Sequence, residues 1–226
     1  MRDSKKAQKI AFFFLFLATI LIILPVGLIV VIIIVKGLPA INWQFISDIP
    51  RLGMRAGGIF PAIVGTLYLV IGAIIFALPI GLLAAIYLSE YSKDNFLNRL
   101  IKLAIVNLAG VPSVVYGLFG LALFVIFFKF GASILSGSLT LGIMILPIII
   151  TTSREAMESV PYSFREVSYS LGASKWQTIR HIVLPNAIPG ILTGTILGLG
   201  RAAGETAPIL FTVAAFYLPQ LPKSIF

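Results

Sequence analysis

The sequence has no cysteine and a single histidine, His181. Without thiols it can form neither a disulfide nor a thiolate metal site, and cysteine catalysis is excluded. One imidazole cannot form a metal cluster by itself, so no metal site is expected. The sequence also lacks a G-x-x-x-x-G-K-[ST] phosphate-binding loop, and its apolar stretches contain no nucleophile paired with an acid–base partner. We therefore expect neither an enzyme nor a bound cofactor.

Charge is scarce as well, and apolar residues take its place. Of the 226 residues, 11% are charged and 59% are hydrophobic, with a mean hydropathy of +1.06. Soluble domains carry roughly 25% charged residues, and a helix needs about 20 apolar residues to cross a membrane. Charge-free runs of suitable length occur at 10–35, 56–89, 103–128, 130–153 and 182–200. The sequence thus predicts an all-α polytopic membrane protein with five spans.

Basic residues outnumber acidic ones, 17 against 8, and the pI is near 10.0. Such a surplus is typical of nucleic-acid binding, but here the charges flank apolar runs, where the positive-inside rule explains them. If the N-terminus is cytosolic, the inner basic residues are Arg2, Lys5, Lys6, Lys9, Lys93, Arg99, Lys102, Arg154, Arg165, Lys175 and Arg180. The smaller outer group is Lys36, Arg51, Arg55, Lys129 and Lys223. We therefore expect a cytosolic N-terminus and no nucleic-acid partner.

A polar segment at 154–185 lies between the fourth and fifth spans. Ser159 and Pro161 are typical of a helix start, and Gly172 is typical of the position just past a helix end. Residues 161–171 are therefore predicted to form a short helix. A structured segment held outside the membrane by apolar flanks is suited to docking a soluble partner.

Other local signals complete the predicted elements. Ser174 and Gln177 match a capping box, which begins a second helix after the short one and so forms an elbow on the cytosolic face. Pro112 predicts a kink in the middle of the third span. Residues 90–102 predict a short amphipathic connecting helix, and the glycine- and serine-rich residues 130–138 predict a turn before the fourth span.

The elbow also carries a spaced pattern that resembles the cytoplasmic loop of ABC-transporter permease subunits. That loop reads Glu-Ala-Ala, three residues, glycine, nine residues, then Ile-x-Leu-Pro. The matching residues here are Glu166, Gly172, Ile182, Leu184 and Pro185. Val167 and Ser168 stand in place of the two alanines. The match therefore depends on five residues at the correct spacing.

Three further stretches resemble one branch of that family, the A-type permease subunit of phosphate-specific transporters. They are GGIFPAIVGT at 57–66, GVPSVVYG at 110–117 and RAAGETAP at 201–208. The similarity extends over roughly 50–226. It implies the permease fold of type I ABC importers and a multi-pass subunit of a prokaryotic cell (inner) membrane.

The resemblance also implies an assembly. The short helix would be a coupling helix that sits in a cleft of an ATP-hydrolysing subunit, and ATP would be bound there. The implied partners are a sibling permease subunit forming a heterodimer, two ATPase subunits, an extracytoplasmic phosphate-binding protein, phosphate and membrane lipid. The residues expected to serve ATPase coupling are Ser159, Pro161, Tyr162, Arg165, Glu166 and Gly172.

Arg201 and Glu205 are predicted to lie on the fifth span, four residues apart and so on one helix face. An ionisable group at membrane depth costs about 2.5–3.5 kcal/mol on insertion scales, so its presence needs a reason. One reason is an internal ion pair that holds the helix packing. The other is a translocation site, in which the planar guanidinium binds phosphate oxygens. The resemblance implies that both residues are important for translocation.

Arg51, Arg55, Gly57 and Gly58 lie in an external segment that leads into the second span. Glycine N–H groups before a helix, together with arginines, present donors to an anion. The same features suit contact with an external binding protein, and they also suit a solvated turn. A possible external anion contact is one of three interpretations that stay open.

The expected organisation is an N-terminal membrane anchor and external loop at 1–58, followed by a permease core at 59–226. An odd number of spans and a proline-rich end predict a C-terminally truncated chain, because members of the resembled family normally have a sixth span. The expected function is the permease subunit of an ATP-driven phosphate importer. A permease for sulfate or molybdate, and a non-transporting membrane scaffold in phosphate sensing, are the alternatives.

Overall fold

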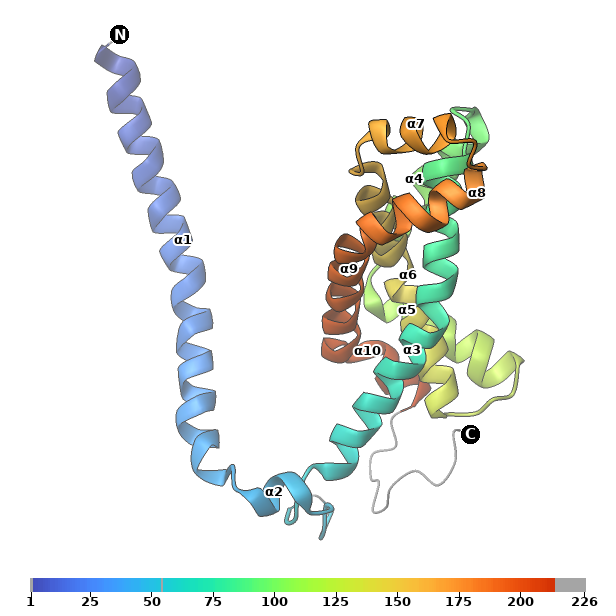
Figure 1. The fold of residues 1–226 in the computed structure, drawn as a ribbon. Helices are drawn as coiled ribbons and strands as arrows, with labels where there is room; N and C mark the ends of the chain where they lie inside the picture. Colours follow the sequence, from blue (N-terminus) through green and yellow to red (C-terminus); the bar gives the residue numbers. More distant parts are fainter. Residues whose placement is uncertain (1, 54, 214–226) are drawn as a thin grey trace. The chain divides into compact units, whose positions relative to one another are not determined.

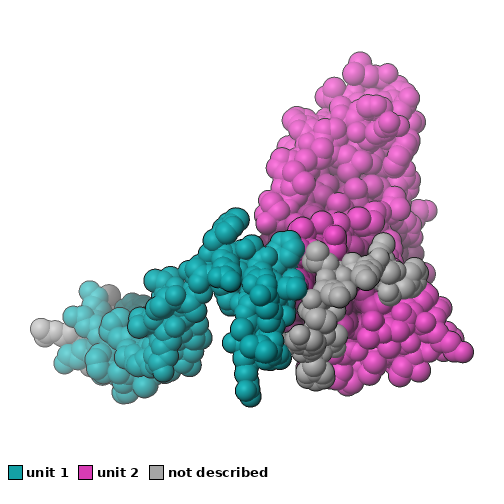
Figure 2. Space-filling model, turned by 90° about the horizontal axis from the view of Figure 1, so that it is seen from below, with its two compact units in different colours: residues 1–60 teal, residues 61–226 magenta. Residues whose placement is uncertain are grey.

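The computed structural model describes residues 2–53 and 55–213. Contacts divide the chain into two compact units, Met1–Phe60 and Pro61–Phe226, which are coloured separately in Figure 2. The described residues are mostly helical, apart from an isolated antiparallel bridge between Arg51 and Ala56. The proline-rich end that predicts truncation lies outside the described residues.

Unit 1 begins with the long helix α1 (Arg2–Gly37), followed by η1 (Leu38–Ala40) and the short helix α2 (Trp43–Ser47). The side chains of α1 from position 5 to position 36 are exposed, and they are apolar on every side of the helix after Ile10. A helix that is hydrophobic all round is typical of a membrane span. Asn42 caps α2 by accepting a hydrogen bond from the backbone N–H of Phe45 at 2.8 Å.

Unit 2 contains the other helices (Figure 1). They are α3 (Phe60–Ile86), which starts at the last residue of unit 1, π-helix η2 (Tyr87–Tyr91), α4 (Phe96–Ala109), α5 (Ser113–Gly120), π-helix η3 (Leu121–Phe127), α6 (Ile134–Glu158), α7 (Tyr162–Ser170), α8 (Lys175–Thr178), π-helix η4 (Ile179–Val183), α9 (Leu184–Gly204) and α10 (Ala207–Thr212).

In the part of the chain that the structure describes, four continuous helices are long and apolar enough to cross a membrane. They are Lys5–Ala40, Phe60–Tyr91, Ile134–Glu158 and Lys175–Gly204. The predicted third span is different, because α4 and the α5–η3 helix meet at a bend of 99°. The predicted change of direction at Pro112 is confirmed, but it is a break between two helices and not a kink within one: Gly110 caps α4, and Pro112, which lacks an N–H, precedes α5. Within residues 2–53 and 55–213, a fifth crossing exists only if the bent pair is counted as one span.

Two other predicted boundaries were also wrong. The turn predicted at 130–138 ends earlier, because Ser133 caps α6 and residues 136–138 already belong to that helix. The amphipathic helix predicted at 90–102 starts only at Phe96, because the second span runs on through the π-helix η2 to Tyr91. Asn95 sets the start of α4 by accepting a hydrogen bond from the N–H of Asn98 at 2.9 Å.

Helix α6 is the centre of unit 2. In its most apolar window 61% of the residues are buried, against 33% for the spans that contain α3 and α9. Glycines allow this packing, because small residues let helix backbones approach closely in a membrane. On α9, Gly190, Gly194 and Gly198 recur every four residues and face Ala156, Thr152 and Ile149 of α6. The α6–α9 pair therefore forms a close backbone contact.

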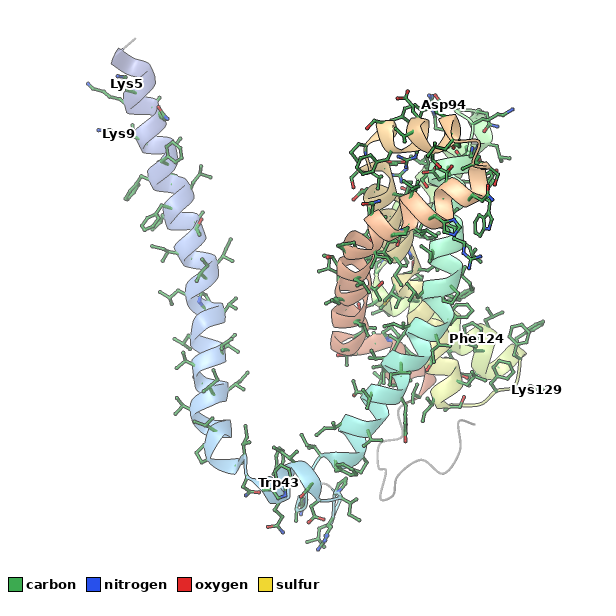
Figure 3. All side chains as sticks on the ribbon, in the orientation of Figure 1. Lys5, Lys9, Trp43, Asp94, Phe124 and Lys129 are labelled. Carbon is green, nitrogen blue, oxygen red and sulfur yellow. The ribbon has the colours of Figure 1, made fainter. Side chains whose placement is uncertain are left out.

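Unit 2 carries the elbow at one end and helix α10 away from it. Asp94, labelled in Figure 3, lies at the end that carries α7 and α8, whereas Lys129 lies toward the other end. Helix α10 also lies away from α7, at the far end of α9 (Figure 1). The segment from Lys175 to Gly204 is one helix of 30 residues, about 45 Å long at 1.5 Å per residue. It therefore joins the elbow to the region of Arg201.

Candidate functional site

The predicted elbow helix is present as α7, and a glycine motif marks its C-terminal end. Gly172 follows the helix with a φ of +80°, a conformation that favours glycine. Its N–H donates to Tyr169 O at 2.9 Å, and the N–H of Ala173 donates to Ser168 O at 3.2 Å. These two bonds form a Schellman motif, which satisfies the last carbonyls of the helix. The predicted helix end at Gly172 is confirmed.

The predicted helix start needs a correction. Ser159 does not begin α7; it is the C-terminal cap of α6, with its hydroxyl donating to Ala156 O at 2.8 Å. Pro161 occupies the N-cap position of α7, and Tyr162 is the first helical residue. Proline suits this place because the first helical turn leaves N–H groups without an internal acceptor. The turn between α6 and α7 therefore consists of residues 159–161.

A buried ion pair holds the inner side of α7. The Arg165 Nη2 atom lies 2.6 Å from Glu90 Oε1, and its Nε donates to the same oxygen at 3.2 Å. The two side chains are only 9% and 7% exposed. Arg165 also donates from Nη1 to Val160 O at 2.8 Å and from Nη2 to Met157 O at 2.9 Å. The predicted coupling residue Arg165 thus faces the interior of unit 2.

Two further contacts hold the elbow together. The buried hydroxyls of Ser168 and Thr178 lie 2.8 Å apart and join α7 to α8. The Lys175 ammonium lies 4.7 Å above the ring of Tyr91, which joins α8 to η2 through a cation–π contact. The capping box predicted at the start of α8 is confirmed, with both reciprocal hydrogen bonds present. The elbow is therefore tied to several neighbouring segments.

The outer side of α7 presents apolar side chains. Val167 is 60% exposed, Leu171 is 84% exposed, and Tyr162 is also exposed. Pro161 and Glu166 lie on the surface as well. Of the residues predicted to serve coupling, the structure thus brings Pro161, Tyr162 and Glu166 to the surface of one helix. The exposed, largely apolar face of a short rigid helix matches the helix-in-groove mode of recognition.

An open pocket of about 460 Å³ lies along the side of α7 that carries Arg165. Its polar lining includes Glu90, Glu158, Arg165, Tyr169 and Lys175. Burial raises the pKa of the Tyr169 phenol above its ordinary value, and the nearby Glu90 carboxylate acts in the same direction. A phenol with the ordinary pKa is already protonated at neutral pH, so the raised pKa only widens the pH range over which Tyr169 keeps its O–H as a donor.

Arg201 and Glu205 form an ion pair at the other end of α9. Arg201 Nε lies 3.4 Å from Glu205 Oε1, and the side chains are 31% and 16% exposed. The prediction that both residues lie on the helix was wrong, because α9 ends at Gly204 and Glu205 is its extended C-cap. Within the described part of the chain, the Nη1 and Nη2 atoms of Arg201 have no hydrogen-bonding partner. Two donor atoms of the guanidinium fork are therefore free to bind another group.

The segment predicted to be external, which contains Arg51 and Gly58, forms a tight turn in unit 1. Arg51 pairs with Asp48 at 3.0 Å, and the N–H of Gly58 donates to Ile49 O at 3.3 Å. Gly57 has a φ of +89°, and a Cβ atom there would collide with the Ile49 carbonyl oxygen. The two glycines therefore serve close backbone packing within unit 1. Arg55 is exposed.

The residue of this site that sequence reasoning missed is Glu90, the partner of Arg165. It lies 75 residues before Arg165, and no local pattern joins the two. The available signal is that Glu90 is the first charged residue after the long apolar run that begins at Ala56. An acid at the end of a span, paired with an arginine in the elbow, is a combination that only the tertiary structure reveals.

The fold and the site define a multi-pass membrane protein that carries an exposed, firmly anchored helical elbow outside its spanning bundle. The chain belongs to the family of binding-protein-dependent transport system inner membrane components, whose model matches residues 77–224. This is a family of ABC-transporter permeases, not of enzymes.

Several relatives agree with that assignment. The chain is 35% identical over 189 residues to the probable ABC transporter permease protein YqgI of Bacillus subtilis, covering 84% of this chain and 64% of YqgI. It is 40% identical over 158 residues to the phosphate transport system permease protein PstA 1 of Mycobacterium tuberculosis, covering 70% of this chain and 52% of the relative. It is 36% identical over 211 residues to the probable phosphate transport system permease protein PstA of Methanocaldococcus jannaschii, covering 93% and 74%.

The fold is also found in a solved structure, an inward-facing conformation of the MetNI methionine ABC transporter. The TM-score is 0.53 at 18% sequence identity, and the match covers 65% of this chain and 68% of the other. The two chains therefore share the helical permease fold.

The chain spans less than two thirds of the length of YqgI and about half that of the mycobacterial relative.

Proposed function

We propose that this chain is a membrane subunit of an ATP-driven importer of inorganic phosphate and forms half of its translocation pathway. The observation that carries the proposal is the Arg201 guanidinium, which is 31% exposed within an apolar bundle and has two donor atoms available. A planar fork of donors suits the oxygens of phosphate. The phosphate-transport names of several relatives support the same substrate.

The proposed assembly places α7 on the cytosolic side of a prokaryotic cell membrane, with the N-terminus also cytosolic. A sibling permease subunit completes the pathway, and two ATPase subunits bind and hydrolyse ATP. A phosphate-binding protein delivers the anion from the outside. ATP binding moves the elbow, and the continuous helix from Lys175 to Gly204 transmits the movement to the region of Arg201.

Replacing Arg201 by glutamine is expected to abolish phosphate uptake while the complex still assembles. Glutamine retains hydrogen bonding but removes the charge that attracts the anion. Arg201→Lys is the matched control: it retains the charge without the planar fork, so partial uptake is expected. The measurement is uptake of radiolabelled phosphate into proteoliposomes that contain the complete complex and the binding protein, with excess sulfate or molybdate as competitors. Unchanged uptake in Arg201→Gln would show that Arg201 is not the anion site. Absence of uptake by the native complex would favour the scaffold function, and competition by sulfate or molybdate would favour another oxyanion.

Val167→Asp is expected to weaken binding of the ATPase subunit about tenfold or more, which corresponds to 1.4 kcal/mol. Val167 is 60% exposed on α7, so an aspartate there places a charge in the proposed apolar contact. Because the side chain is exposed, the stability of the permease itself should change by less than about 0.5 kcal/mol. Val167→Thr, which has nearly the same shape, is the control and should bind almost normally. Equal ATPase binding by all three proteins would contradict the docking role of this face.

A further inference from the structure

Arg165 connects three helical segments that are far apart in the sequence. Its guanidinium binds Glu90 in the π-helix η2, at the inner end of the span that begins with α3. The same group donates to the carbonyls of Met157, in the last turn of α6, and of Val160, just after it. Arg165 itself belongs to α7. Elbow, second span and central helix therefore meet at one side chain.

The elbow has another connection to the membrane helices, which runs through Gly172 into α8 and α9. That route follows the backbone. Its glycine is exposed, and a Cβ atom added to it would have no neighbour within 4 Å. The route transmits a push on α7 to α8 and α9, and α8 contacts η2 through the cation–π contact between the exposed side chains of Lys175 and Tyr91. From α7 itself, the hydrogen bonds of Arg165 reach η2. Because these bonds are buried and charge-assisted, the ion pair is the stronger connection between the elbow and the span that begins with α3.

The chemistry of the pair suits a connection that stays intact during movement. The Arg165 side chain is nine-tenths buried and binds Glu90 through two nitrogen atoms, so the pair is both charge-assisted and directional. A buried pair is weakly screened by salt, and separating it leaves two charges without solvent. Small displacements of α7 are therefore more easily accommodated by moving η2 and the end of α6 than by breaking the pair.

We propose that Glu90 and Arg165 are positioning residues that make α3 and α6 move with the elbow, so that ATP hydrolysis is coupled to opening of the pathway. This inference depends on the proposed importer function. It assigns to Glu90, outside the recognised loop pattern, a role in transport that is separate from ATPase docking. The pair faces inward, whereas the docking face carries Val167 and Leu171.

The test compares Glu90→Gln with the native chain in the complete reconstituted complex. Glutamine retains the shape and one acceptor but removes the charge. We expect the ATPase subunits to remain bound and to hydrolyse ATP, while the phosphate transported per ATP falls about fivefold or more, the scale of a typical coupling energy. The KM for the phosphate-loaded binding protein should be unchanged. Arg165→Lys, which retains the charge without the fork, should show the same fall if Glu90→Gln does not assemble.

Glu158→Gln is the matched control. Glu158 lines the same pocket and pairs with Arg154 at 3.8 Å within a single helix, so the substitution removes the same charge without disconnecting any element. Its ratio of phosphate to ATP should equal that of the native complex. An equal fall in Glu158→Gln would overturn the proposal, because the effect would then come from the charge of this surface. An unchanged ratio in both Glu90→Gln and Arg165→Lys would overturn it as well.

A spectroscopic measurement separates movement from mere stability. Because the chain has no cysteine, spin labels can be placed at Tyr87→Cys on η2 and Ser170→Cys on α7, both exposed positions, without removing any native thiol. With the pair intact, the distance between the labels should stay constant when ATP is added. In Glu90→Gln it should change or broaden with ATP, and a constant distance there would contradict the proposal. A native complex that takes up no phosphate would instead refute the importer function itself.

Discussion

Arg165→Met is expected to lower the free energy of unfolding by about 3–5 kcal/mol, because the Glu90 carboxylate would remain buried without its partner. The carboxylate is 7% exposed and loses both nitrogen donors of Arg165 at once. The Met157 and Val160 carbonyls lose a donor in the same substitution. For a chain of this length the expected fall in Tm is roughly 10 °C. Fluorescence of the two tryptophans during heating in detergent measures it, and Trp176 lies within the elbow itself.

The double variant Glu90→Leu/Arg165→Met provides the control. Replacing both members of a buried ion pair by apolar residues is often neutral or stabilising, so most of the lost Tm should return. Recovery should be incomplete, because the carbonyls of Met157 and Val160 still lack the donor. If the double variant is as unstable as Arg165→Met, the buried charge of Glu90 is not the cause of the loss.

Gly194→Leu is expected to separate α9 from α6 and to destabilise the protein by about 3 kcal/mol, at the upper end of the usual cost of overpacking. A Cβ atom at Gly194 would lie 2.5 Å from Thr152 Cβ. Threonine is branched at Cβ and stiff, and its hydroxyl already donates to Ile148 O at 2.8 Å, so it cannot easily move aside. The backbones must therefore move apart, and the yield of folded protein in size-exclusion chromatography should fall together with the Tm.

Gly200→Leu is the matched control for that substitution. It lies on the same helix, six residues further on, and no atom lies within 4 Å of its built Cβ. The same change of residue type there should leave the Tm within a few degrees of the native value. Because leucine favours a helix more than glycine does, helix propensity cannot destabilise either variant. Equal destabilisation by both substitutions would therefore indicate that added bulk anywhere on α9, and not the α6–α9 contact, is responsible.

The short-range features of the elbow followed from the sequence. The end of α7 at Gly172 and the capping box at Ser174 were predicted correctly, because both depend on residues within one helical turn. The first residue of α7 was missed by one position and its N-cap by two, because Pro161 and not Ser159 occupies the cap. Ser159 is a good N-cap residue by type, but the fourth span extends to Glu158, and Ser159 ends that helix instead. The last turn of α6 buries Met157 in a core cluster with Ile179 and Val183, a tertiary contact that the local pattern does not contain.

The membrane spans also contain features that the sequence predicted and one that it did not. Apolar runs located the helices of the second, fourth and fifth spans, because crossing hydrocarbon imposes length and composition. The 99° bend at Gly110–Pro112 could not be read as more than a kink. A proline allows either a bent helix or a complete break, and the outcome depends on which groups satisfy the freed backbone. Here the Tyr116 hydroxyl donates to Leu108 O at 2.8 Å, across the break.

The sequence by itself determined that this is a membrane protein with apolar spans and a polar helical elbow. Hydrophobicity, helix caps and glycine turns could be read because each acts over a short stretch of residues. The sequence also identified Arg201 and Glu205 as charges that need a reason within an apolar region. Only the tertiary structure decided that Arg165 points inward to Glu90, across 75 residues, while Val167 and Leu171 point outward. The physical reason is that a buried charge is stable only beside its partner, and that partner is brought near by the packing of α3, α6 and α7.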